Sequence, residues 1–182
     1  ATGSRGRKTG NPKGRAARGR KRTRAINGAR PWTAEASRKR EADVFKQILV
    51  PTDFSERSLR PLDIAVNIAE HYGGTVQMLH VVEIIQGTSF EECEEFYRKL
   101  ENKARHQMAE QRKAFRDRGV TIEEAVTYGN RAQEILKFSE ENRSDLIIMN
   151  SHRVDLGRPS EGWGTISYKV GMLCTCPILL VK

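Results

Sequence analysis

Short apolar runs alternate with segments of helical periodicity along most of the chain, and this alternation constrains the fold more than any other feature. Apolar residues recur at steps of three and four between the runs, which predicts helices over 56–71, 89–118, 132–142 and 165–173. The apolar runs themselves predict strands over 45–50, 75–82, 120–127, 145–150 and 177–181. Because these strands lack polar alternation, the pattern predicts an α/β fold, a parallel sheet with helices on both faces and right-handed crossovers.

Turn residues mark the ends of the predicted elements. Pro51 is expected to stop the first strand, and Ser55 or Asp53 can cap the helix that follows. The pair Gly73-Gly74 closes that helix, since glycine accepts the left-handed conformation common at helix ends.

Positive charge is concentrated in the first quarter of the chain. Residues 1–45 hold 14 Lys/Arg and 3 Asp/Glu, whereas the remaining 137 residues hold 18 and 20. The first segment also has almost no apolar residues, so we predict a basic disordered tail over 1–43 and a folded domain over 44–182. Lysine and arginine interleaved with glycine can associate with nucleic acid through counterion release. The chain begins with Ala1 rather than methionine. An alternative origin of the tail is therefore a remnant of expression or an over-extended reading frame.

Cysteine content and hydropathy indicate the compartment. An odd, small set of cysteines (Cys93, Cys174 and Cys176) favours a reducing environment. Cys174-Thr-Cys176 is not a zinc spacing, so packing at a helix end is expected and no metal is predicted. No apolar run reaches the roughly 18 residues of a membrane span. The expectation is a cytoplasmic protein without a membrane partner.

A ligand of such a sheet is expected beyond the carboxyl ends of the strands, near the point where strand order reverses. The loop from Asn150 to Thr165 leads from an apolar strand into a predicted helix and contains three glycines before the helix. A helix start offers unpaired N–H groups and positive dipole, which suits a phosphate or another anion. Other candidates at this edge are Pro51, Thr52, Asp53, Val81, Val82, Glu83 and Gly129.

The ordered set of motifs after the tail resembles the universal stress protein domain, over residues 45–182. The matching residues are Ile48–Ser55 (ILVPTDFS), Leu79–Val82 (LHVV), Gly129, Asp145–Met149 with Ser151-His152, Gly164-Thr165 and Cys176–Val181 (CPILLV). The resemblance implies a five-stranded parallel sheet of order 3-2-1-4-5, adenine-nucleotide alpha-hydrolase-like, and a stress-response or regulatory role. It also implies a homodimer formed through the last strand, 177–181.

One branch of the family binds ATP or AMP, and the resemblance carries its binding residues to this chain. Asp53 and Val81 match the residues that hold adenosine, while a loop of form Gly-x-x-Gly-x9-Gly-[Ser/Thr] holds the phosphates. Gly164-Thr165 match the final pair, but Asn150 and Arg153 replace the first two glycines, and ten residues rather than nine precede Gly164. A side chain at these positions can occupy phosphate space, and Arg153 can alternatively contact a phosphate directly. The candidate nucleotide-binding residues are Pro51, Thr52, Asp53, Val81, Asn150, His152, Arg153, Gly164 and Thr165.

Several single residues have a plainer interpretation beside the functional one. Asp53 serves equally well as a helix cap, and His80 is expected to be a packed, satisfied histidine in a buried strand. Ser151 and His152 are adjacent near a strand end and point to opposite sides, so they are not expected to form a nucleophile–base pair. Trp163 is expected either to contact a ligand or partner or to pack as a lid on the core.

No residue pattern of vigorous catalysis is present. The sequence has no P-loop lysine motif, metal cluster or convincing pair of carboxylates. The sequence therefore predicts a non-catalytic regulatory homodimer with a degenerate nucleotide-binding loop. Two alternatives remain: an ATP- or AMP-binding protein with slow ATP hydrolysis, and a protein that associates with nucleic acid through residues 1–43.

Overall fold

The structure, a computed structural model, describes residues 44–85, 87, 93–151 and 164–182. The predicted tail over 1–43 and three loop residues of interest, His152, Arg153 and Trp163, lie outside the described residues. The predictions made for them therefore stay predictions.

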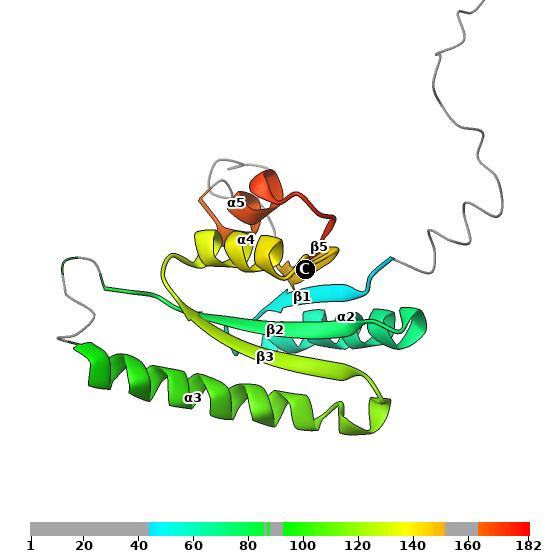
Figure 1. Ribbon diagram of the computed structural model, residues 1–182, viewed down its shortest axis with the longest axis horizontal. Coiled ribbons are helices and arrows are strands. Elements are labelled where there is room, and N and C mark those ends of the chain that lie inside the picture. Colours follow the sequence, from blue (N-terminus) through cyan, green and yellow to red (C-terminus); the bar gives the residue numbers. More distant parts are fainter. Residues whose placement is uncertain (1–43, 86, 88–92, 152–163) are drawn as a thin grey trace, which may run out of the picture. The chain divides into compact units, whose positions relative to one another are not determined.

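Five parallel strands form one sheet in the order β3-β2-β1-β4-β5 (Figure 1). The order confirms the predicted fold class. The chain adds strands outward from β1 in one direction, then returns and adds β4 and β5 on the other side, so β1 and β4 flank the switch point. The strands are β1 Gln47–Pro51, β2 Thr75–Val82, β3 Thr121–Tyr128, β4 Leu146–Asn150 and β5 Ile178–Val181.

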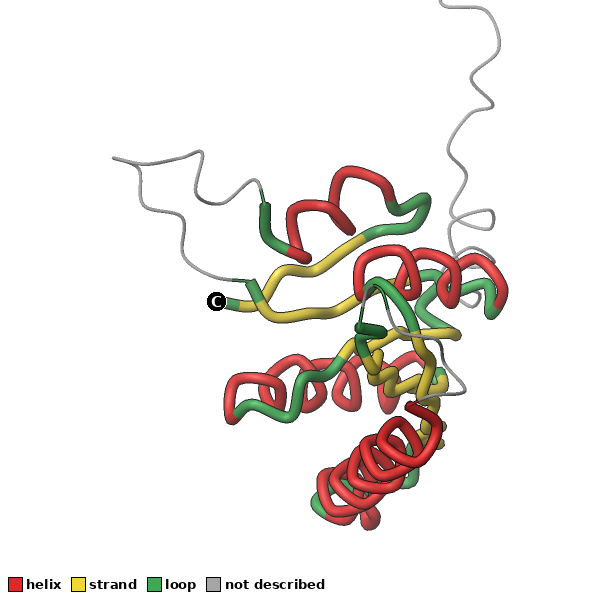
Figure 2. Tube along the Cα trace, turned by 90° about the vertical axis from the view of Figure 1, so that its left-hand side faces the viewer, coloured by secondary structure: helices red, strands yellow, loops and turns green. Residues whose placement is uncertain are grey.

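Helices cover both faces of this sheet. In Figure 1, α2 and α3 lie on one face and α4 and α5 on the other, and the view turned by 90° in Figure 2 shows strands between the two helical layers. Short 3-10 helices precede α2 and follow α3. The helical segments are η1 Glu56–Ser58, α2 Leu59–Tyr72, α3 Glu94–Lys113, η3 Arg116–Arg118, α4 Arg131–Glu141 and α5 Ile166–Leu173.

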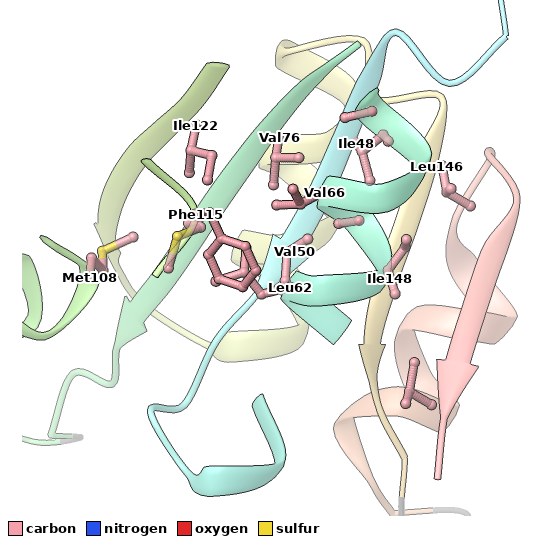
Figure 3. Packing of buried hydrophobic residues seen from close by; sticks show 14 residues of the cluster. Ile48, Val50, Leu62, Val66, Val76, Met108, Phe115, Ile122, Leu146 and Ile148 are labelled. Atoms are coloured by element: carbon pink, nitrogen blue, oxygen red, sulfur yellow. The ribbon is translucent and has the colours of Figure 1, made fainter. Parts of the chain in front are cut away.

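The side-chain alternation of the strands divides the core into two clusters. Ile48 and Val50 of β1 pack with Leu62 of α2 on one face (Figure 3), whereas Leu49 packs with Ile135 of α4 on the other. Ile48, Leu49 and Val50 of the central strand are therefore buried, with side chains on both faces of the sheet, as this apolar run predicts.

The end of β1 agrees with the prediction, whereas the helix that follows it does not. Pro51 is the last residue of β1, opposite Leu79, so the strand stops at the predicted proline. Its missing N–H would face β4, where pairing with β1 has already ended after Leu49, so no ladder bond is lost. The predicted single helix over 56–71 is instead η1 followed by α2, and Ser55 makes no side-chain capping bond to it.

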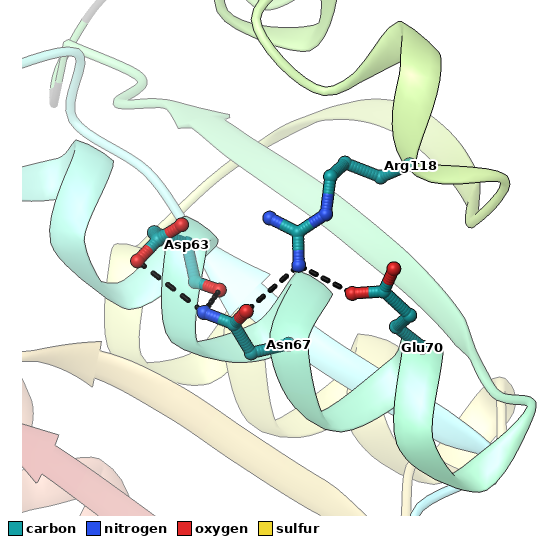
Figure 4. Close-up of polar contacts among 4 residues, drawn as sticks. All are labelled: Asp63, Asn67, Glu70 and Arg118. Atoms are coloured by element: carbon teal, nitrogen blue, oxygen red, sulfur yellow. Dashed lines mark hydrogen bonds and ion pairs between the residues drawn. The ribbon is translucent and has the colours of Figure 1, made fainter.

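Polar contacts tie the end of the α3 segment to α2 across the same face of the sheet (Figure 4). The Arg118 guanidinium of η3 donates to Asn67 Oδ1 at 2.7 Å and also to the Glu70 carboxylate. Gly73 and Gly119, which follow α2 and η3, adopt left-handed φ angles of 65° and 68°. Glycine is therefore required by backbone conformation at both ends. Within the described ranges, no helix combines the length and apolar character that crossing a bilayer requires.

Candidate functional site

A pocket of about 370 Å³ opens at the switch point of the sheet, beyond the carboxyl ends of β1 and β4 and beside the first residues of α4 and α5. We call it the switch-point pocket. Seven of the nine candidate residues line it, and the other two, His152 and Arg153, are not described. Its lining residues are Pro51, Thr52, Asp53, Leu79, His80, Val81, Arg131, Ile135, Met149, Asn150, Gly164, Thr165, Ile166 and Ser167. Val82, Glu83 and Gly129 do not line it.

The end of β1 exposes backbone polar groups of β2 to this pocket. Thr52 N–H donates to Leu79 O at 2.8 Å, and pairing between the two strands goes no further. The backbone N–H and C=O groups of alternate residues in a strand point the same way, so those of Val81 point in the same direction as Leu79 O. Because β1 has already ended at this level, no hydrogen bond among the described residues joins the Val81 groups to β1. A buried backbone donor and acceptor side by side are therefore available to a ligand.

The Asp53 carboxylate lies in the turn that follows β1. Its Oδ1 accepts hydrogen bonds from Ser55 N at 3.0 Å and Ser55 Oγ at 2.7 Å. Burial by itself raises the pKa of the Asp53 carboxyl, but the Ser55 hydrogen bonds and the Arg131 charge together outweigh it and lower the pKa. Asp53 is thus ionised at neutral pH, and it caps its own turn rather than the helix.

Asn150, the residue that replaces the first glycine of the family loop, lines the pocket but turns its side-chain amide toward backbone groups of η1. Met149 packs on the α4–α5 side of β4 and Ile148 on the α2 side, so strand alternation turns the Asn150 side chain toward α2. The amide orientation that satisfies its neighbours puts nitrogen 2.7 Å from Arg57 O and oxygen 3.2 Å from Ser58 N. With its amide engaged at η1, Asn150 is not expected to compete with phosphate, and this stays a prediction.

The first residues of α5 form the opposite wall of the pocket. Thr165 is the N-cap, and its Oγ1 accepts from Tyr168 N at 3.3 Å. The hydroxyl of Ser167 lies 3.3 Å from Thr165 Oγ1 and 3.3 Å from Ser151 Oγ. A Cβ added to Gly164 would meet no atom within 4 Å. This wall therefore offers hydroxyls and a helix start to an anion.

Two charged or titratable residues of the pocket were not among the predicted binding residues. Arg131 is the first residue of α4, and its Nη2 lies 3.1 Å from Glu83 Oε2. Its position directly after the carboxyl end of β3 is the signal that could have found it. His80 is half-buried rather than fully packed, and its Nδ1 lies 2.9 Å from Thr52 O. Burial is the largest effect on its pKa, which is lowered, so the ring is neutral at pH 7.

The chain from the start of the sheet to its last strand matches one family model. That model, the universal stress protein family, covers residues 45–182. The chain belongs to the universal stress protein family. The match spans all five strands and the whole switch-point pocket, so the resemblance predicted from the sequence motifs is confirmed.

Relatives within the universal stress protein family have moderate sequence identity to this chain. Universal stress protein MJ0531 of Methanocaldococcus jannaschii is 29% identical over 143 residues, which cover 77% of this chain and 84% of the relative. The solved structure of MJ0577 is 29% identical with a TM-score of 0.59, and the alignment covers 76% of this chain and 96% of that one. A universal stress protein from Archaeoglobus fulgidus in complex with dAMP shares the fold at 19% identity, with a TM-score of 0.56 over 76% of this chain and 99% of that one.

In the described part of the chain, no metal-holding group is found and the two C-terminal cysteines pack against the core. Among the residues that the structure describes, no group of three His, Cys, Asp or Glu side chains is arranged to hold a metal ion. Cys174 donates to Cys176 O at 3.3 Å, and both cysteines pack against the α4–α5 cluster, as the packing interpretation expects.

Proposed function

We propose that the switch-point pocket binds an adenine nucleotide, ATP or AMP, and that the protein acts as a regulatory universal stress protein rather than an enzyme. One observation supports this most directly. Seven of the candidate nucleotide-binding residues, from the ends of β1, β2 and β4 and from the segments beside β1 and α5, converge on one pocket at the switch point. Apolar walls with a few convergent polar groups are typical of a nucleotide site.

The polar groups of the pocket complement an adenine nucleotide along its length. The C=O and N–H of Val81 can accept from the adenine amino group and donate to the neighbouring ring nitrogen. The ionised Asp53 carboxylate can accept from a ribose hydroxyl. The start of α5, with Gly164 and the Thr165 hydroxyl, suits the phosphates. The A. fulgidus relative in complex with dAMP supports this chemical class of ligand.

The titratable groups of the described pocket favour binding over turnover. The Asp53 carboxylate is engaged by two hydrogen bonds from Ser55, and the Nδ1 of His80 is engaged by Thr52 O. A general base must reach the attacking water with an available lone pair and a suitable pKa. Asp53, with its lowered pKa, is a poor proton acceptor, so ATP hydrolysis is expected to be absent or slow.

Small molecules released from the purified, denatured full chain test this proposal. Mass analysis is expected to show co-purified ATP or AMP, and calorimetry on the emptied protein should show saturable binding of the same nucleotide. Phosphate release from bound ATP, followed in the same samples, separates a regulatory binder from a slow hydrolase. The proposal of nucleotide binding would be wrong if the purified protein contains no nucleotide and shows neither a heat of binding nor a shift in melting temperature with millimolar ATP or AMP.

We also propose that two copies associate through β5. Among the described strands it is the outermost and pairs with β4 alone, and its Leu179 and Leu180 are both partly exposed. An unpaired edge with apolar side chains is a template for another strand. Association of residues 1–43 with nucleic acid remains a separate prediction from composition.

A further inference from the structure

His80 lies in the wall between the switch-point pocket and a second hollow of about 320 Å³ beside α3. Its Nδ1 is 2.9 Å from the carbonyl oxygen of Thr52. Because a carbonyl oxygen can only accept, Nδ1 must carry the proton and donate to it. His80 thereby ties the carboxyl-terminal part of β2 to Thr52, the residue at which β1 leaves the sheet.

The same ring also holds Phe54, two residues further along. The rings of Phe54 and His80 are stacked with centroids 4.4 Å apart and planes inclined by 30°. Phe54 has a φ of 61°, a left-handed backbone conformation that a bulky residue adopts at a cost. Phe54 N–H donates to Thr52 Oγ1 at 3.2 Å, which closes the turn. Contacts from a neighbouring element must offset that strain, and the His80 ring supplies one of them.

Asp53 is the residue between these two anchored positions. Its carboxylate accepts hydrogen bonds from Ser55 and interacts with His80 by charge, whereas the ring's direct contacts are with Thr52 and Phe54 on either side of Asp53. We propose that His80 is a positioning residue of the switch-point pocket, which fixes the Thr52–Ser55 turn and so aims the Asp53 carboxylate at the ligand. The part that concerns the ligand rests on the proposed nucleotide binding; the positioning of Asp53 does not.

The surroundings of the ring, its burial above all, favour this neutral, hydrogen-bonded state. The groups near it are Asp53 after β1, Glu83 after β2, Lys103 of α3 and Arg131 of α4. Burial and the Arg131 charge both oppose protonation of the ring, and the bond to Thr52 and the Asp53 charge only partly offset them. The Nδ1–H tautomer is therefore the form expected at neutral pH, and the ¹⁵N shifts of the His80 side chain would report it.

Two substitutions separate the two contacts of the ring in the full chain. His80→Phe keeps an aromatic ring for Phe54 but removes the donor to Thr52, whereas His80→Asn keeps a donor near Nδ1 and removes the stacking. His106→Asn, at an exposed position of α3, is the matched control. Thermal melting first confirms that each variant is folded.

Nucleotide affinity is the first readout. His80→Phe is expected to weaken ATP binding about five- to tenfold, the size of one lost hydrogen bond, while His80→Asn recovers part of the loss and His106→Asn changes nothing. Combined with Asp53→Asn, His80→Phe should cost less than about twofold more, because the group that it positions is already altered. Equal losses in both backgrounds would overturn the positioning role, since a merely structural defect would weaken binding in either.

The pKa of the Asp53 carboxyl, followed by carbon NMR, is a second readout that needs no ligand. His80→Phe should raise this pKa toward its ordinary value, because the Ser55 hydrogen bonds depend on the turn, and His106→Asn should not. An unchanged pKa in His80→Phe would contradict the inference whether or not nucleotide binds. If the wild-type chain binds no nucleotide but the pKa of Asp53 shifts in His80→Phe, the proposed function is wrong and the positioning role of His80 still holds.

Discussion

At the scale of single residues, Gly164 tests whether the start of α5 receives the phosphates. Gly164 and Gly171 both have open space around an added Cβ, and neither has a left-handed φ, so alanine is tolerated at each. Gly164→Ala should leave the free energy of unfolding within about 0.5 kcal/mol of wild type. It should weaken ATP binding at least about tenfold, because its methyl group enters the pocket. Gly171→Ala should not weaken binding, and an equal loss of affinity in both variants would argue against a phosphate site here.

For Asn150→Ala we expect the opposite result, a lower free energy of unfolding with an unchanged nucleotide affinity. Asn150→Ala removes the side-chain contacts to Arg57 O and Ser58 N, which should lower the free energy of unfolding by about 1–2 kcal/mol in urea titrations. Nucleotide affinity should stay within about twofold. Asn102→Ala, on the exposed side of α3, is the control for stability. A large gain in affinity for Asn150→Ala would show instead that the asparagine does fill phosphate space.

His80 also gives the fold a defined dependence on pH. Its pKa is lowered from 6.5 in the folded protein, chiefly by burial, so the unfolded chain binds the proton first as pH falls. The free energy of unfolding should therefore decrease from pH 6.5 downward and level off once the folded protein is protonated. Urea unfolding across this range should show a shallower slope for His80→Phe than for wild type. Identical slopes would mean that the ring is no more buried than it is in the unfolded chain.

The sequence predicted which residues line the pocket better than it predicted where their side chains point. Asp53, Val81 and Thr165 could be named from motif matches, because their place at strand and helix ends follows from the order of elements. The orientation of Asn150 follows from that of Ile148, two residues earlier on the same face, but only once the end of β4 is known. The left-handed turn at Phe54 could not be predicted, since it depends on a ring supplied by another strand.

At the scale of elements, α2 is held to the sheet by its apolar face rather than by the polar contacts of Figure 4. Leu62 is 1% exposed within the cluster of Figure 3, while Leu59, one turn earlier, is 43% exposed. Leu62→Ala should lower the free energy of unfolding by about 2–5 kcal/mol and Leu59→Ala by less than about 1 kcal/mol, measured by urea unfolding. Similar losses for both leucines would contradict the packing described for α2.

Element type was predictable throughout the described residues, and element ends were not. A continuous apolar run distinguishes each strand, and apolar residues at steps of three and four distinguish each helix. The ends depend on single contacts: Asp145 accepts from Lys46 N and Gln47 N, which lets β1 begin at Gln47 rather than at Phe45. Such contacts join residues about a hundred positions apart, so local patterns do not contain them.

At the scale of the whole molecule, the exposed edge of β5 predicts the oligomeric state. Leu180→Lys introduces a charge at a side chain that is 37% exposed on this edge, and it should convert a dimer to a monomer in sedimentation velocity. Ile84→Lys is the control, since Ile84 is 39% exposed but follows β2, on the other side of β1 from β5. If Leu180→Lys remains a dimer, the interface does not include this edge of β5.

The strand order also sets when the pocket can exist during synthesis. β1, β2 and β3 are neighbours in the sheet and leave the ribosome first, whereas β4 and the start of α5 follow the end of β3 by some tens of residues. At a synthesis rate of roughly 5–20 residues per second, the growing chain spends a few seconds with β1, β2 and β3 made and the β4-facing edge of β1 unpaired. Nascent chains should therefore need protection at that edge, and they should respond to nucleotide only after Ser167 has emerged.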